Sequence, residues 1–140
     1  MKAFDFSLEK ILEVREFNEK QSEIELGNAI SKTNRIQLQL QDIAKQKVTA
    51  NQNRYSTSNV QSILLVEHFI TRLDKEKEKL LNELAAAELV VEQKRAELAE
   101  AMKQRKVLSK LKEKQLKVYK KEKNKKEEQE IDDVSKNYHA

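Results

Sequence analysis

The 140-residue sequence contains no Cys, no Pro and no Trp, and it has a single Gly. Without Cys, neither a disulfide framework nor a Cys-based metal site can form, and the chain suits a reducing compartment. The longest apolar run, Ile63 to Val66, is far too short to span a bilayer, and the N-terminus lacks the apolar stretch of a signal peptide. We therefore expect a cytoplasmic protein that does not insert into the membrane.

Charge is abundant, because Asp, Glu, Lys and Arg make up 37% of the residues. Such a composition alone would favour disorder, but apolar residues recur three and four positions apart from Ile63 to Tyr119. This spacing indicates a long helix that buries a narrow stripe, here called the seam, against a partner helix. The first half of the chain carries a weaker, more polar seam: Leu8, Leu12, Arg15, Glu19, Ser22, Leu26, Ala29, Ile36, Leu40 and Ile43.

Between the two seams, residues 51–59 lose the apolar period and gather Asn, Ser and Thr, which are typical of turns. Ser58 followed by Gln61 matches a helix capping box. Two helices joined by a short loop lie antiparallel. We therefore predict an all-α protein of one domain, residues 1–140: an antiparallel two-helix coiled-coil hairpin. Its helices should span about 7–50 and about 60–130, the second being longer and ending in a frayed acidic tail.

The expected helices differ in length, because a rise of 1.5 Å per residue gives roughly 65 Å for the first and over 100 Å for the second. If the turn is centred near Tyr55, Leu8 lies beside Met102. The second helix should then overhang the first from that point onward.

The expected overhang is strongly basic. Residues 103–126 contain twelve Lys or Arg against two Glu. Because Leu108 and Leu111 would have no partner within the chain, we expect this arm to dock into another protein; the alternative is a solvated charged face. Nucleic-acid binding is disfavoured, since the run lacks interleaved aromatic residues and no groove-reading motif accompanies it.

A second surface exceeds what a two-helix seam needs. From Ile63 to Leu73 the apolar residues spread over more than one helical face. Leu65 and Phe69 either pack over the loop or form an exposed docking surface for a partner.

The sequence gives little support to catalysis. His68 and His139 have no second His or carboxylate at metal-ligand spacing, and there is no Gly-rich phosphate loop or nucleophile elbow. We expect a protein that is not an enzyme and that holds no metal or cofactor.

Three stretches together resemble one known family. They are FDFSLEKILEVRE at residues 4–16, RKVLSKLKEKQLKVY at 105–119 and EEQEIDDVS at 127–135. Their order and separation are similar to the N- and C-terminal signatures of the flagellar export protein FliJ family. The sequence departs from the commoner pattern at Ser109, where an acidic residue is frequent, and at Val14, where an aromatic or larger apolar residue is frequent.

The resemblance implies a part of the flagellar type III export apparatus, peripheral to the cytoplasmic face of the membrane. Members of the family resemble the central stalk of rotary ATPases. They bind the hexameric export ATPase, promote its assembly, couple it to the membrane export gate and escort export chaperones. By resemblance, the residues that meet the ATPase ring are Leu8, Leu12, Arg15, Arg105, Lys106, Leu108, Lys110 and Leu111. Those that meet the cytoplasmic domain of the gate protein are Phe69, Leu73, Glu76 and Leu80.

Two other readings remain open. One is a structural coiled coil that self-associates, although the charged seam positions disfavour an indefinite symmetrical coil; they are Lys77, Lys94, Arg105 and Lys112. The other is the equivalent stalk of a virulence secretion system.

Overall fold

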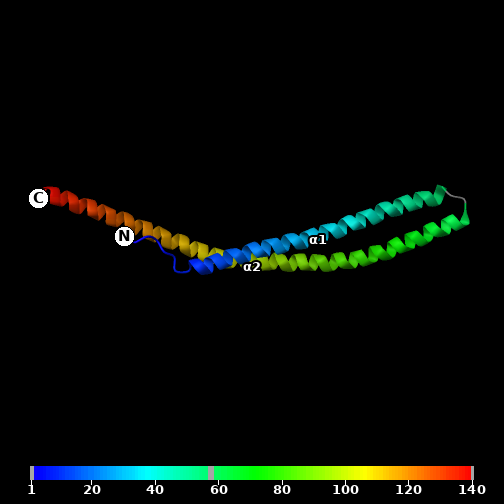
Figure 1. The fold of residues 1–140 in the computed structure, drawn as a ribbon, viewed down its shortest axis with the longest axis horizontal. Coiled ribbons are helices and arrows are strands. Elements are labelled where there is room, and N and C mark those ends of the chain that lie inside the picture. The colour runs from blue at the N-terminus through cyan, green and yellow to red at the C-terminus, as the bar shows by residue number, and fades with distance from the viewer. Residues whose placement is uncertain (1, 57–58, 140) are drawn as a thin grey trace. The chain divides into compact units, whose positions relative to one another are not determined.

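The computed structural model describes residues 2–56 and 59–139, in which the regular secondary structure consists of two helices (Figure 1). Helix α1 spans Glu9–Ser56 and helix α2 spans Val60–His139. The chain reverses direction between them, and α2, with 80 residues, is longer than α1, with 48. The protein is therefore an all-α antiparallel hairpin with a longer second helix, as predicted.

The turn lies later in the chain than expected, because the last turns of α1 occupy most of the predicted loop. The Ser56 hydroxyl donates back to the Asn53 carbonyl at 2.9 Å, so this polar side chain is satisfied without leaving the helix. An ion pair between Arg54 and Glu67 ties the end of α1 to α2. These contacts show why a cluster of turn-forming residues remains helical.

The start of α2 is capped by Asn59. Its side-chain Oδ1 accepts a hydrogen bond from the Gln61 N–H at 3.0 Å, and its carbonyl accepts one from the Ile63 N–H at 3.0 Å. This is the geometry of an N-cap residue. Ser58, the cap expected from the sequence, lies outside the described residues.

The start of α1 and the end of α2 also differ from the predicted positions. α1 begins at Glu9 rather than near residue 7, because the first helical hydrogen bond of its main chain runs from the Leu12 N–H to the Leu8 carbonyl, at 2.9 Å. α2 continues to His139 instead of fraying near residue 130. Oppositely charged residues four positions apart support a helix in this region; the pairs are Lys123 with Glu127, Lys126 with Glu130, and Asp132 with Lys136.

The chain divides into two compact units. The loop unit, Ser22–Leu98, contains the second part of α1 and the first part of α2. The terminal unit combines the residues up to Gln21 with those from Ala99 onward.

The core of the loop unit is the predicted seam. Its buried members come from both helices at heptad spacing: Ile36, Ile43, Leu73, Leu80 and Ala87, with Leu40, Phe69 and Leu84 packed against them. Lys94, a charged seam position, forms ion pairs of 3.2 Å with both Glu25 and Glu97. Its hydrogen bonds raise the pKa of Lys94, the bond to Glu25 having the larger effect and the bond to Glu97 the smaller. The charge at this seam position is therefore compensated.

The core of the terminal unit shows that the predicted register was wrong. Leu8 was expected beside Met102, but it packs in a cluster with Leu108 and Leu111. Glu9 likewise pairs with Lys112, where the expected register would put it near residue 101. The register is therefore displaced by roughly ten residues, nearly three helical turns. The displacement follows from the later turn, which moves every α1 residue further along α2.

Candidate functional site

The terminal unit holds all the residues that the resemblance assigned to the ATPase ring, and its apolar members form an internal cluster. Phe6, Leu12 and Leu108 are buried, with Phe4, Leu8 and Leu111 packed against them. The expectation that Leu108 and Leu111 have no partner within the chain was therefore wrong. These leucines pack between the two helices, where Leu108 is buried and Leu111 half-buried.

The residues before α1 extend the contact along α2. The Tyr119 hydroxyl donates to the Lys2 carbonyl at 2.6 Å, and the ring of Phe4 lies 5.6 Å from that of Tyr119, tilted by 52°. Phe6, only 4% exposed, anchors this segment in the cluster. The N-terminal segment thus covers part of the arm that the sequence placed in the overhang.

Two arginines from the predicted set make contacts within the terminal unit. Arg105 donates from Nε to Oε2 of Glu19 at 2.6 Å and from Nη2 to Oε1 at 3.2 Å. Its hydrogen bonds lower the pKa of the Glu19 carboxyl, and Glu19 in turn raises the pKa of Arg105. Arg15 Nη1 donates to the Gln104 carbonyl at 2.9 Å. Both arginines therefore contribute to pairing the helices.

The remaining predicted residues, Lys106 and Lys110, are exposed on α2. Between them lies Val107, which is 58% exposed. A shallow hollow joins the three side chains with Ala99, Met102 and Lys103. The exposed members of the predicted site are thus two lysines, and they flank an exposed apolar residue that was not predicted to belong to it.

The outer face of α1 carries two exposed apolar residues that sequence analysis did not single out as a surface. Val14 and Phe17 are 58% and 63% exposed. Their spacing of three residues, off the Leu8 and Leu12 stripe, was the signal that could have identified them.

The residues assigned to the export gate are divided by the seam of the loop unit. Leu73 and Leu80 are buried in its core. Phe69 is half-buried, and the Arg72 guanidinium carbon lies 5.5 Å from the centre of its ring. Glu76 is exposed. Of the four, only Glu76 and part of Phe69 are accessible to a partner.

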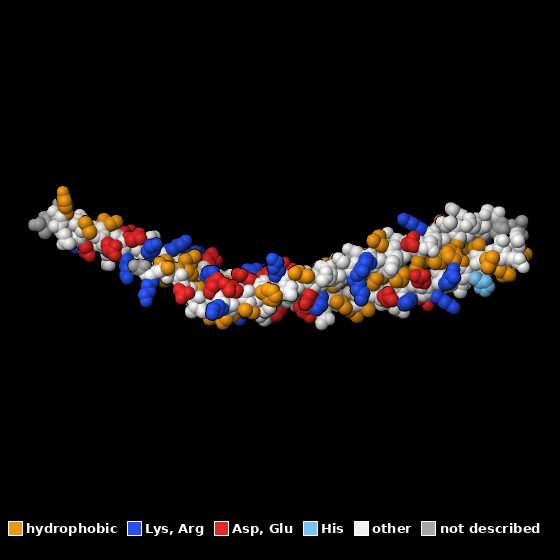
Figure 2. All heavy atoms as spheres, in the orientation of Figure 1, with side chains coloured by type: hydrophobic (Ala, Val, Ile, Leu, Met, Phe, Trp, Pro, Cys, Tyr) orange, Lys and Arg blue, Asp and Glu red, His pale blue; other side chains and the backbone are white. Residues whose placement is uncertain are grey.

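Exposed apolar residues do gather near the turn (Figure 2). Leu64 and Leu65 are 53% and 69% exposed. Leu65 lines a hollow with Phe69 of α2 and with residues of α1, among them Thr49 and Ala50. The apolar excess predicted for this region is therefore at the surface.

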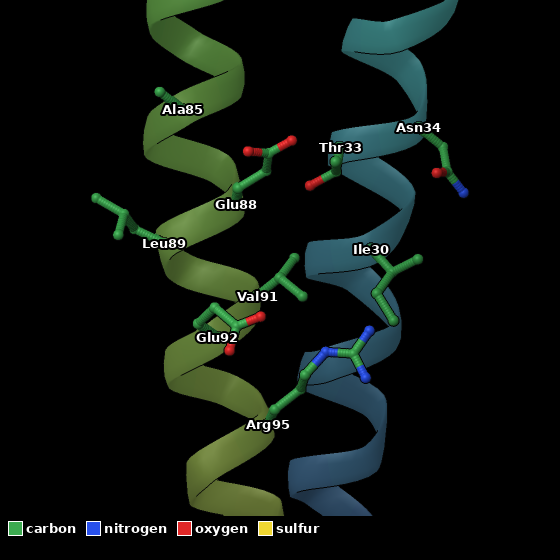
Figure 3. A pocket seen from close by; sticks show the side chains of 9 residues that line it. All are labelled: Ile30, Thr33, Asn34, Ala85, Glu88, Leu89, Val91, Glu92 and Arg95. Carbon is green, nitrogen blue, oxygen red and sulfur yellow. The ribbon is translucent and has the colours of Figure 1, made fainter.

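A second hollow of the loop unit lies along the groove between α1 and α2 (Figure 3). It encloses about 660 Å³ and is lined by Ile30, Thr33, Asn34, Ala85, Glu88, Leu89, Val91, Glu92 and Arg95. Figure 3 shows the side chains of Glu88 and Thr33 pointing toward each other, whereas Leu89 points away from α1. This groove was not predicted, because its lining comes from both helices.

The described residues contain neither a metal-binding cluster nor a membrane-spanning helix. Within residues 2–56 and 59–139, no three His, Asp or Glu side chains lie close enough to hold a metal ion. In the same residues, no helix has a stretch sufficiently long and apolar to cross a membrane.

The chain matches a family described as flagellar FliJ protein over residues 4–140. No curated protein matches the chain, and no solved structure does.

Proposed function

Because the chain belongs to the flagellar FliJ family and is thereby a component of the flagellar export apparatus, we propose that it is the coiled-coil stalk of the export ATPase. In this role it binds the hexameric ATPase, promotes its assembly and activity, and couples it to the membrane export gate. It works at the cytoplasmic face of the membrane and also escorts export chaperones. The match over residues 4–140 supports the role in export, and the hairpin fold supports a stalk.

The observation that carries the proposal is the exposed basic surface of the terminal unit. Lys106, Val107 and Lys110 are accessible on α2, while the leucines beneath them are buried in the seam. Charged groups accelerate encounter with an oppositely charged partner, and apolar contact lowers the dissociation rate. We therefore place the ATPase contact on this outer surface and assign the leucines to the folding of the stalk.

The test uses the purified export ATPase of the same organism and measures hydrolysis with and without this protein. Lys106→Glu combined with Lys110→Glu should slow association and flatten its salt dependence. Val107→Ser should raise the dissociation rate and reduce stimulation at any salt concentration.

The matched control reverses two exposed lysines of the loop unit, Lys75→Glu with Lys79→Glu, which changes the net charge equally. This variant should stimulate the ATPase like the parent. If the Lys106 and Lys110 variant also does so, the ATPase does not bind here.

For the export gate, we propose a surface that combines Glu76 and the exposed edge of Phe69 with Leu65. Leu73 and Leu80 act indirectly, since their burial fixes the helix that carries the contact residues. Leu65→Ser should weaken binding to the cytoplasmic domain of the gate protein without lowering helicity. Leu38→Ser, at a residue of α1 that is 62% exposed, is the control. Equal gate binding by both variants would exclude Leu65 from the contact.

A further inference from the structure

The last part of α2 projects beyond the contacts of the N-terminal segment. Tyr119 contacts Lys2 and Phe4, but Gln115, Lys117 and Val118 before it are exposed. Every side chain that the structure describes from residue 120 to 138 is exposed as well. The helix itself continues through this segment to His139. A long exposed stretch of helix is therefore available to another molecule.

Charge in this region is divided into two consecutive segments of equal length. The basic block, residues 115–126, has six Lys and one Glu, and the acidic block, residues 127–138, has five Asp or Glu and one Lys. Within one chain the two blocks cannot face each other, because α2 runs through their junction without a break. The helix contains no Pro or Gly at which it could fold back.

We propose that a second copy of this chain pairs with the first along residues 115–138, in antiparallel orientation. In such a two-fold arrangement the basic block of each copy faces the acidic block of the other, so the same pairing of opposite charges occurs at two places in the dimer. A parallel arrangement would instead place like charges opposite each other. Charge therefore selects both the partner and the orientation.

Apolar residues of the acidic block add to the contact. Ile131 and Val134 are 67% and 68% exposed and lie three residues apart, on one face of the helix with Glu127 and Tyr138. A shallow hollow is lined by Ile131, Val134, Glu127 and Glu130. In the antiparallel pair these apolar side chains meet the basic block, where the aliphatic stems of lysines cover them while the ammonium groups reach the carboxylates.

The balance of these interactions sets the character of the dimer. The exposed apolar side chains of the paired segment are Val118, Ile131, Val134 and Tyr138 in each copy. They are fewer than a stable coiled coil of this length uses, so most of the attraction is electrostatic and screened by salt. The dimer should therefore form at low ionic strength and dissociate as salt is added. It leaves Lys106 and Lys110 outside the paired segment, so it is independent of the function proposed above.

The experiment is sedimentation equilibrium of the full chain at low and high salt. Dimerisation of the parent should weaken by at least about tenfold when salt rises from about 50 mM to about 500 mM. A parent protein that is monomeric at low salt over the whole concentration range would overturn the proposal. A dimer that is insensitive to salt would do so too, because another surface would then hold it.

Two charge-reversed variants test the pairing directly. The first makes the acidic block basic, by Glu128→Lys, Glu130→Lys, Asp132→Lys and Asp133→Lys. The second makes the basic block acidic, by Lys121→Glu, Lys123→Glu, Lys125→Glu and Lys126→Glu. Each variant alone should be monomeric, since its two blocks carry the same sign of charge.

Mixing the two variants should restore a one-to-one heterodimer, because each block then meets its opposite. Circular dichroism establishes that each variant is helical before mixing. The control reverses four exposed glutamates of the loop unit, and it should dimerise like the parent: Glu78→Lys, Glu83→Lys, Glu88→Lys and Glu92→Lys. Failure of the mixture to form heterodimers, or dimerisation of either variant alone, would overturn the pairing.

Discussion

Arg105 of α2 donates two hydrogen bonds to the Glu19 carboxylate of α1, from Nε to Oε2 at 2.6 Å and from Nη2 to Oε1 at 3.2 Å. Both residues occupy seam positions, and the Glu19 side chain is only 13% exposed. Bidentate pairs of this kind combine charge with fixed geometry. The seam of the terminal unit thus includes a bidentate ion pair, as the seam of the loop unit includes the ion pair of Lys94 with Glu25.

We predict that Arg105→Met lowers the free energy of unfolding, because Glu19 then keeps its charge near the seam without its partner. Replacing both residues, Glu19→Leu with Arg105→Met, should recover the loss, since an apolar pair needs no compensation. Urea unfolding followed by circular dichroism measures all three proteins. A double variant less stable than the single Arg105 variant would contradict this account.

The same pair should make stability depend on pH. The bond from Arg105 lowers the pKa of Glu19 in the folded protein below its ordinary value of 4.5. The resulting stabilisation is fully present above the ordinary value and is lost as the pH falls through the lowered, folded-state pKa. The difference in unfolding free energy between the parent and Glu19→Gln should therefore shrink on acidification below about pH 4.5. A difference that stays constant with pH would show that the carboxylate charge contributes nothing.

The buried cluster predicts that substitutions at two neighbouring residues change the free energy of unfolding by different amounts. Leu108→Ala should cost about 2 kcal/mol of stability, because it removes a buried side chain from contact with Phe6 and Leu12. Val107→Ala, at an exposed position, should change stability by no more than about 0.5 kcal/mol. Denaturant unfolding compares the two. Equal losses would mean that the helices do not meet in the observed register.

We predict that the residues preceding α1 are held against α2 by the hydrogen bond from Tyr119. Tyr119→Phe removes the hydrogen bond to the Lys2 carbonyl but keeps the ring that contacts Phe4. Hydrogen exchange of the residues preceding α1 should therefore accelerate without loss of helicity in α2. Tyr55→Phe, at a side chain that is 87% exposed, is the control and should leave that exchange unchanged. Unaltered exchange in Tyr119→Phe would show that this hydrogen bond does not hold the segment.

Gly27 offers a stabilising substitution. It lies within α1 without a positive φ, and a methyl group added there would meet nothing within 4 Å. Gly27→Ala should therefore raise the free energy of unfolding by about 1 kcal/mol through helix propensity alone. A measured decrease would show that a close contact at this position has been missed.

The seam was predictable from the sequence because heptad spacing directly determines which side of a helix is buried. The register was not, because a heptad pattern is unchanged when one helix slides by seven residues. What distinguishes the registers is the pairing of particular charges, such as Lys112 with Glu9 at 2.8 Å. The position of the turn, moved by the continuation of α1 to Ser56, could not be read from composition.

The accessibility of the candidate contact residues could be predicted from the sequence only in part. Leu108 and Leu111 were expected to lie beyond the end of the first helix, whereas both pack between the helices. Leu73 was expected both in the seam and at a docking surface, and it is buried in the seam. Val107 and Leu65 are exposed beside them. A sequence shows that a residue is apolar, but only the pairing of the helices determines whether it faces the seam or the solvent.

The central claim is that the outer surface of the terminal unit contacts the export ATPase, and site-specific photocrosslinking tests it most directly. A photoreactive amino acid placed at Val107 should crosslink to the purified ATPase, and the same group at Leu38, an exposed residue of the loop unit, should not. Absence of a crosslink from position 107, or an equal yield from both positions, would contradict the claim.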